Sequence, residues 1–149
     1  MISEITHVGV TVSDIDRSIE FYRDVIGLEY LGRAVMEGKA TDLLFAREGC
    51  VVDVAYLRRG NVECPPVELI HFRGTSTEKQ DADLFRTSIS EICFITDDIW
   101  SEYRRMRDLG VEFLSEPQPF DFTREGFGRS LAVYFRDPDG IVMELVQNI

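Results

Sequence analysis

Hydrophobic and polar residues alternate near the start of the chain, in the pattern typical of a β-strand. Over residues 5–12 the alternation places valines on one face and mostly polar or small residues on the other. Ser13-Asp14 then offers an N-cap, and apolar residues at helical spacing follow over residues 15–25. Gly27 is suited to end a helix, because it tolerates a left-handed backbone. The pattern predicts a strand followed by an amphipathic helix.

Three more strands are predicted in the first half of the chain, at residues 28–35, 51–57 and 67–72. The stretch 38–47 fits a short helix, although its pattern also allows a strand. Residues 74–86 are polar and charged, which is typical of a connector. The first half is therefore predicted to run strand, helix, and then strands.

The second half repeats this order. Asp97 is positioned to cap a helix over residues 99–109, and Gly110 to end it. The tetrapeptide Asp137-Pro138-Asp139-Gly140 predicts a tight turn between two strands, because proline and glycine suit its second and last positions. The predicted strands are residues 90–96, 111–114, 130–135 and 141–147, with a long loop at 115–128.

Aligning the two halves superimposes residues that can bind a metal. The first strands align His7 with Glu91, and the last strands align Glu68 with Glu144. A carboxylate within an apolar strand costs free energy unless it is paired, hydrogen-bonded or bound to metal. We therefore expect these four positions to form one shared polar centre in a curved sheet.

The composition fits a cytoplasmic protein of one domain, residues 1–149. Its 44% hydrophobic content is ordinary, and no run is apolar for long enough to span a bilayer. The first residues lack the features of a signal peptide. A net charge of −11 disfavours binding to nucleic acid or to an anionic membrane. The cysteines lack a C-x-x-C spacing and are expected to be inert thiols: Cys50, Cys64 and Cys93.

Longer motifs at both ends of the chain resemble one known superfamily. They are HVGVTVSD at residues 7–14, SIEFYRDVIGL at 18–28 and YFRDPDGIVMELV at 134–146. The chain resembles the vicinal-oxygen-chelate superfamily, which includes glyoxalase I, methylmalonyl-CoA epimerase, fosfomycin-resistance proteins, bleomycin-binding proteins and extradiol dioxygenases. The resemblance implies an α+β fold of two βαβββ modules, at 1–73 and 88–149, forming a curved mixed sheet with a metal-binding cup.

The resemblance also implies a ligand set. Metal-binding members take ligands from the first and last strands of each module, which here carry His7, Glu68, Glu91 and Glu144. Glu91 stands where the family commonly has a second histidine, and a carboxylate can still bind a metal. One imidazole with three carboxylates favours Mn²⁺, Mg²⁺, Fe²⁺, Ni²⁺ or Co²⁺ over Zn²⁺.

The implied reaction is removal of a proton beside a metal-chelated carbonyl, as in lyases, isomerases and epimerases of the glyoxalase I or methylmalonyl-CoA epimerase type. Either Glu68 or Glu144 can be the catalytic base, and Glu91 is a third candidate. Arg124 and Arg129 lie in a loop rich in aromatic residues and glycine, where they can bind a carboxylate or phosphate of a small-molecule substrate. Relatives often pair, so a homodimer is expected.

Two other functions remain open from the sequence. The first is a binding protein of the antibiotic-resistance kind, which holds a ligand without metal. Three acidic residues within strands favour an enzyme over such a binder. The second is an extradiol-type dioxygenase, whose iron site usually needs two histidines and a glutamate. Because His71 is predicted on the opposite face from Glu68, this alternative ranks last.

Overall fold

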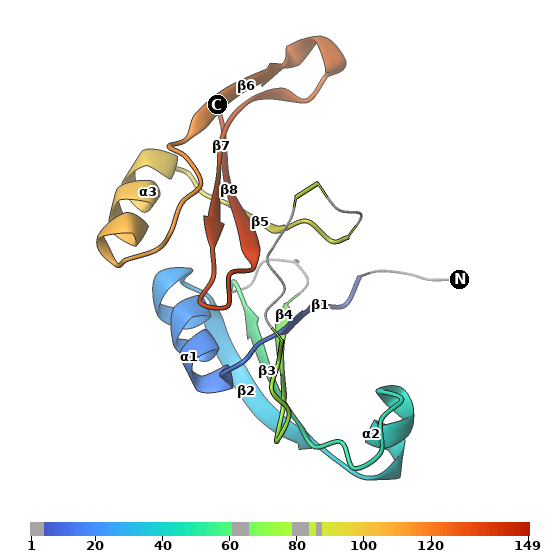
Figure 1. Cartoon of the computed structure of the whole chain (residues 1–149). Helices are drawn as coiled ribbons and strands as arrows, with labels where there is room; N and C mark the ends of the chain where they lie inside the picture. The colour runs from blue at the N-terminus through green and yellow to red at the C-terminus, as the bar shows by residue number, and fades with distance from the viewer. Residues whose placement is uncertain (1–4, 61–65, 79–83, 86–87) are drawn as a thin grey trace. The chain divides into compact units, whose positions relative to one another are not determined.

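The computed structural model describes residues 5–60, 66–78, 84–85 and 88–149. Contacts divide the chain into two compact units, Met1–Glu78 and Lys79–Ile149. Each unit has a four-stranded mixed sheet and its own helices (Figure 1), so the predicted α+β class with paired βαβββ modules is confirmed. The strands form one open sheet in each unit. None of the described helices is long and apolar enough to cross a bilayer.

The sheet of the first unit has the order β1-β4-β3-β2. Its strands are β1 (Val8–Thr11), β2 (Glu29–Met36), β3 (Val52–Arg58) and β4 (Val67–Phe72). The first strand runs parallel to the last, and the other two pairings are antiparallel. All four strands lie where they were predicted, with small shifts at their ends. The parallel pairing matters for function, because it places the residue before β1 beside β4.

Helix α1 (Ile15–Glu20) covers one face of this sheet. Asp14 caps it, because one side-chain oxygen accepts hydrogen bonds from two backbone amides of the first turn, each 3.1 Å long. The helix continues as a π-helical segment, η1 (Phe21–Val25), and the chain turns away at Gly27, whose φ is +85°. The predicted helix is therefore confirmed in extent but not in its hydrogen-bonding pattern. Its buried face includes Ile15 and Ile19, and the helix contacts β3 and β4.

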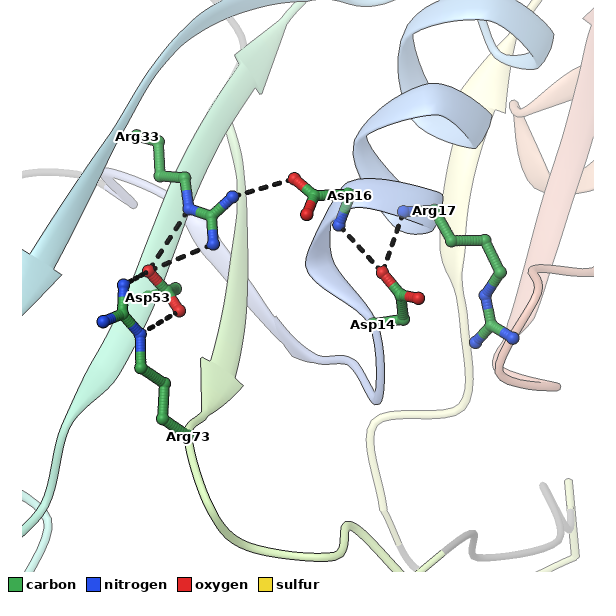
Figure 2. Close-up of polar contacts among 6 residues, drawn as sticks. All are labelled: Asp14, Asp16, Arg17, Arg33, Asp53 and Arg73. Atoms are coloured by element: carbon green, nitrogen blue, oxygen red, sulfur yellow. Dashed lines mark hydrogen bonds and ion pairs between the residues drawn. The ribbon is translucent and has the colours of Figure 1, made fainter.

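A charged clamp on the helix side of the sheet holds these elements together (Figure 2). Asp53, 2% exposed, accepts two hydrogen bonds of 2.7 Å from Arg73 and one of 3.2 Å from Arg33. Arg33 also donates to Asp16 of α1 over 2.8 Å. The hydrogen bond from Arg73 is the main cause that lowers the pKa of Asp53 to about 2, with Arg33 adding to it against the effect of burial. The clamp ties β2, β3, the end of β4 and α1 together.

The short helix α2 (Lys39–Leu44) connects β2 and β3 at the far end of their hairpin (Figure 1). The helical alternative for this stretch is therefore confirmed over the strand. Phe45, which follows the helix, packs edge-on against Phe72 with ring centroids 5.1 Å apart. This contact places α2 beside the face of the sheet opposite α1.

The second unit repeats the topology, with the order β5-β8-β7-β6. Its strands are β5 (Ile92–Ile95), β6 (Gln118–Phe122), β7 (Gly128–Arg136) and β8 (Val142–Asn148). Again the first strand lies parallel to the last. The 3-10 turn η2 (Thr123–Glu125) joins β6 to β7.

Helix α3 (Ile99–Asp108) is capped one residue later than predicted. Its cap is Asp98, which accepts a 3.0 Å hydrogen bond from the backbone amide of Ser101. Asp97 was the wrong choice, because its backbone carbonyl instead accepts a hydrogen bond from the side chain of Gln147. Two adjacent aspartates cannot be distinguished as caps by sequence pattern alone.

The strand predicted at residues 111–114 was also wrong. Phe113 makes one isolated bridge to Phe135 and packs its ring against Tyr103, with centroids 4.7 Å apart. The edge strand lies instead within the predicted loop, at β6, whose residues are all exposed. Pro119 argued against a strand in the sequence, because proline cannot donate a backbone hydrogen bond. An edge strand tolerates proline, because the backbone groups on its outer side need no partner strand.

The predicted turn between β7 and β8 is confirmed. The amide of Gly140 donates to the carbonyl of Asp137 over 3.0 Å, and φ of Gly140 is +84°. The buried side chain of Asp137 accepts further hydrogen bonds from the amides of Asp139 and Ile141, of 2.9 and 2.8 Å. This turn sets the register that places Glu144 opposite Tyr134.

Candidate functional site

His7 and Glu68 meet on the face of the first sheet opposite α1. His7 immediately precedes β1, and Glu68 lies in β4 opposite Gly9. The distance from His7 Nε2 to Glu68 Oε2 is 3.1 Å. The Glu68 side chain is 12% exposed, whereas that of His7 is 41% exposed. The first unit thus presents a nearly buried carboxylate beside an accessible imidazole, as the repeat predicted for this pair.

Tyr56 is a third member of this group, and sequence reasoning missed it. It lies on β3 opposite Glu68 and donates its hydroxyl hydrogen to Glu68 Oε1. Its ring stands edge-on to the His7 ring, with centroids 6.1 Å apart. This hydrogen bond, with smaller effects of burial and of the Glu68 charge, raises the pKa of Tyr56 to about 12. The sequence did offer one indication of this contact. Alternation along β3 and β4 allows a tyrosine and a buried glutamate to face the same side of the sheet, where the hydroxyl can bind the carboxylate.

The surroundings of this group are apolar, and a glycine lies beside Glu68. A cluster formed by Cys50, Val52 and Val54 packs against Tyr56 and Ile70 on this side of the sheet. Gly9 contributes no side chain: a Cβ placed there would come within 3.2 Å of Ile70 Cδ1 and 3.8 Å of Glu68 Oε2. The carboxylate therefore sits at the margin of an apolar surface, which is the setting that strengthens electrostatic interactions.

The second unit carries a matching row of residues. Glu144 on β8 lies opposite Cys93 on β5 and opposite Tyr134 on β7. Loss of solvation, followed by a hydrogen bond to Glu144, raises the pKa of the Cys93 thiol to about 12. Burial, and then the charges of Glu144 and Glu91, also raise the pKa of Tyr134. These four side chains therefore influence one another electrostatically within one unit.

The register makes the internal repeat exact at the site. The row Gly9–Glu68–Tyr56 in the first sheet corresponds to Cys93–Glu144–Tyr134 in the second. Among the described residues, no three His, Cys, Asp or Glu side chains form one group able to hold a metal ion. Each unit supplies one pair of the predicted ligands. The centre of four ligands stays a prediction.

The pair in the first unit fits one side of a metal site. Ligand atoms about 2.1 Å from a metal on adjacent octahedral corners lie about 3.0 Å apart. The 3.1 Å between His7 Nε2 and Glu68 Oε2 matches that spacing. Thr6 Oγ1 lies 3.3 Å from the other ring nitrogen of His7, which leaves Nε2 facing the carboxylate. Donor types and spacing together suit a hard divalent cation.

The two arginines predicted to bind substrate lie at the β6–β7 connection. Arg124 is exposed in η2, and Arg129 is exposed near the start of β7. Arg129 Nε donates to Asp121 Oδ2 over 3.0 Å, so a surface carboxylate already partners this guanidinium. A substrate role for either arginine stays a prediction.

Other candidates from the sequence have structural roles or lie outside the description. His71 Nδ1 is 3.2 Å from the carbonyl oxygen of Val12, on the face away from Glu68. Since a carbonyl can only accept, this nitrogen must carry the proton. Cys50 is buried in the apolar cluster, as expected of an inert thiol. Cys64 and much of the predicted connector, residues 79–83 and 86, lie outside the described residues.

Comparison with known proteins agrees with this architecture. A probable lactoylglutathione lyase of Synechocystis sp. (strain ATCC 27184 / PCC 6803 / Kazusa) is 28% identical over 141 residues, which cover 95% of this chain and 92% of that protein. A solved glyoxalase family protein of Bacillus cereus superposes with a TM-score of 0.86 at 21% identity, covering 100% of this chain and 96% of that one. TnmS3, an antibiotic-binding protein of Streptomyces sp. CB03234, superposes with a TM-score of 0.65 at 21% identity, covering 99% and 98%.

The family model agrees with the resemblance seen in the motifs. The model of the Glyoxalase/Bleomycin resistance protein/Dioxygenase superfamily matches residues 4–145, which include both units and every predicted ligand. The match therefore spans nearly the whole chain rather than one of its repeats. The chain belongs to the Glyoxalase/Bleomycin resistance protein/Dioxygenase superfamily.

Proposed function

We propose that this protein is a divalent-metal-dependent lyase or isomerase, which moves a proton beside a carbonyl of a small α-oxygenated substrate. One observation carries the proposal: Glu68 is nearly buried and held between Tyr56 and His7, in a row that the second unit repeats around Glu144. Membership of the superfamily and the relative named as a probable lactoylglutathione lyase support a lyase.

Of the four predicted positions, we assign His7, Glu68 and Glu91 to the metal and keep Glu144 for the reacting proton. A bound divalent cation would supply Lewis-acid polarisation of the substrate carbonyl. The chain's own contribution is a hard set of oxygen and imidazole donors, which favours ions such as Mn²⁺, Ni²⁺ or Co²⁺ over a thiolate zinc site. The apolar surface beside Glu68 would limit the access of water to the reacting carbon.

We assign different roles to the two repeated carboxylates. Both oxygens of Glu68 are engaged, one by the Tyr56 hydroxyl and the other by the His7 imidazole. Such a carboxylate is well held as a ligand and poorly placed to take up a proton. Glu144 faces Cys93 across the β5–β8 pairing, and a thiol is a weaker donor than a phenol. Glu144 is therefore the proposed base.

The proposed substrate follows from the chemistry of the relative's name. Lactoylglutathione is the thioester of a 2-hydroxy acid, and its cleavage by a lyase gives a thiol and a 2-oxoaldehyde. In the connecting isomerisation, the proton on the hydroxyl-bearing carbon moves to the neighbouring carbon while the carbonyl and hydroxyl exchange positions. A single base facing both carbons can remove and return this proton. We propose the hemithioacetal of a 2-oxoaldehyde as the substrate class.

Substitution of the two carboxylates tests the proposal. In protein stripped by a chelator and reloaded with Mn²⁺, Glu144→Gln should lower kcat on the hemithioacetal by about 100-fold or more, because a general base is lost. Glu68→Gln should instead mainly weaken Mn²⁺ binding. Glu29→Gln, an exposed position at the start of β2, is the matched control and should leave both quantities unchanged.

Exchange of a substrate proton with solvent tests the proposed reaction directly. In heavy water, the wild-type protein should incorporate deuterium into the product at the carbon that receives the proton, as measured by NMR. Wild-type protein that binds none of these cations, and exchanges no proton across a panel of 2-oxoaldehyde hemithioacetals and 2-hydroxy thioesters, would overturn the proposal.

A binding function is the second candidate. Phe45 and Phe72, which are partly buried and pack on the cluster of Cys50, Val52 and Val54, offer aromatic rings on the face of the sheet that carries Glu68. The likeness to an antibiotic-binding protein concerns the fold alone. Tight binding of an aromatic antibiotic to protein without metal, measured by calorimetry, would favour this function. A dioxygenase has less support, because one of the two histidines in the sequence bonds to a carbonyl on the opposite face.

A further inference from the structure

Tyr56 touches both members of the His7–Glu68 pair. Its hydroxyl donates to Oε1 of Glu68, while Oε2 of the same carboxylate lies 3.1 Å from His7 Nε2. The rings of Tyr56 and His7 also form a T-shaped pair, with an interplanar angle of 81°. The two contacts with Glu68 involve different oxygens, so together they define the plane of the carboxylate.

A glutamate carboxylate does not fix this plane by itself. Its terminal torsion is broad and has no sharp staggered wells, so the two oxygens interchange readily. A donor fixed to one oxygen removes that freedom. Tyr56 is suited to provide it, because its ring packs against the apolar cluster of Cys50, Val52 and Val54. Because packing restricts the ring of Tyr56, its hydroxyl in turn restricts the orientation of the Glu68 carboxylate.

We propose that Tyr56 is a positioning residue of the metal site: its hydroxyl binds one oxygen of Glu68 so that the other is presented beside His7 Nε2. The inference rests on the proposed function, since it assigns a role toward the same metal. Partners that orient a ligand in this way commonly change metal affinity by about 10- to 100-fold when removed.

The repeat extends the inference to the second unit. Tyr134 lies opposite Glu144 in the register that Tyr56 has opposite Glu68. The two rows differ in two ways: Cys93 stands where the first row has Gly9, and of the two tyrosines described here only Tyr56 is hydrogen-bonded to the glutamate it faces. Glu144 thus has a thiol neighbour in addition to the tyrosine. We expect the tyrosine to matter more for the orientation of Glu68 than for that of Glu144.

The test removes the hydroxyl and keeps the ring. Tyr56→Phe should weaken Mn²⁺ binding by about 10- to 100-fold in titration calorimetry, and should change the visible absorption spectrum of the Co²⁺-loaded protein, which reports ligand geometry. Tyr30→Phe is the matched control, because Tyr30 is 39% exposed on β2. It should change neither quantity. Tyr134→Phe should weaken binding less than Tyr56→Phe.

A double-substitution cycle separates positioning from general stability. If Tyr56 acts through Glu68, adding Tyr56→Phe to Glu68→Gln should weaken Mn²⁺ binding by less than twofold further. The melting temperature of each metal-free variant shows whether it is folded. If metal-free Tyr56→Phe does not fold, Tyr56→Leu takes its place, because it also removes the hydroxyl and keeps an apolar side chain against the cluster, and its Mn²⁺ affinity must then fall.

The outcomes distinguish this inference from the proposed function. Wild-type Mn²⁺ affinity and an unchanged Co²⁺ spectrum in Tyr56→Phe would overturn the positioning role and leave the metal-dependent enzyme standing. Equal effects of Tyr56→Phe in the wild-type protein and in the Glu68→Gln variant would overturn it as well. Absence of Mn²⁺ and Co²⁺ binding in the wild-type protein would overturn the proposed function itself.

Discussion

Asp53 and Glu68 are nearly buried carboxylates on opposite faces of the first sheet, and the chain stabilises them in different ways. Asp53 has two arginines as partners, which offset its charge within the fold. Glu68 has a phenol and an imidazole, which supply hydrogen-bonding groups but no permanent positive charge. The first arrangement is complete without a ligand. The second is suited to a cation, in line with the role proposed for Glu68.

The Asp53 clamp predicts an acid-sensitive contribution to stability. The pKa of Asp53 is about 2 in the folded protein, below its ordinary value of 3.8. The carboxylate therefore adds stability, roughly 2 kcal/mol, that is fully present above about pH 4 and is lost as the pH falls toward 2. Urea unfolding across this pH range should show the loss in wild type and less of it in Asp53→Asn. Asp108→Asn, at an exposed position of α3, is the control, and an identical pH dependence in wild type and Asp53→Asn would contradict the prediction.

At the residue scale, the repeat alone identified His7, Glu68, Glu91 and Glu144 as candidates. The structure confirms that His7 and Glu68 are neighbours. Tyr56 could not be found in the same way. Alternation assigns a residue to a face, but the partner across the sheet depends on register, which the sequence leaves open. The Tyr56–Glu68 pairing exists because β3 and β4 align in one of several possible registers.

At the scale of elements, strong periodic patterns and turn residues were reliable guides. The first sheet, α1, α2 and the β7–β8 turn all lie where hydrophobic spacing and glycine positions predicted them. The failure lay in the second unit, between α3 and β7. There Phe113 is apolar because it packs against Tyr103, whereas β6 is an exposed edge without a buried face. Tertiary packing decides such short segments, and local pattern cannot.

The β7–β8 turn gives a prediction at this scale. Gly140 has φ of +84°, so a Cβ there strains the backbone even though no heavy atom lies within 4 Å of it. Gly140→Ala should lower the free energy of unfolding by about 1–2 kcal/mol, as measured with urea. Gly140→Asn should cost less, because asparagine tolerates this region better. Equal losses for both substitutions would point to a cause other than backbone strain.

At the scale of the whole molecule, charge favours the capture of cations. The chain has 27 acidic and 16 basic side chains, giving a net charge of −11. A negative field of this kind raises the local concentration of divalent ions and repels anionic polymers. It is consistent with a small-molecule function that uses a metal. Formation of a homodimer stays a prediction, for light scattering to test.

Salt should therefore weaken metal binding in a simple way. Raising KCl from about 20 mM to about 500 mM shortens the Debye length from roughly 20 Å to roughly 4 Å. The apparent Kd for Mn²⁺ should rise several-fold over this range, mainly through slower association. Sucrose at matched osmolality is the control and should have little effect. An affinity that does not depend on salt would indicate that the local ligands alone, without the wider field, determine binding.

The parallel pairing of β1 with β4 also has a consequence for synthesis on the ribosome. Val8 finds its partner only when Val67 has been made, because β4 is the last strand of the first unit to be translated. Strand β1 therefore stays unpaired while β2 and β3 are being translated. His7, which immediately precedes that strand, reaches Glu68 at the same moment. Completion of the first sheet and formation of the His7–Glu68 contact therefore occur together during translation.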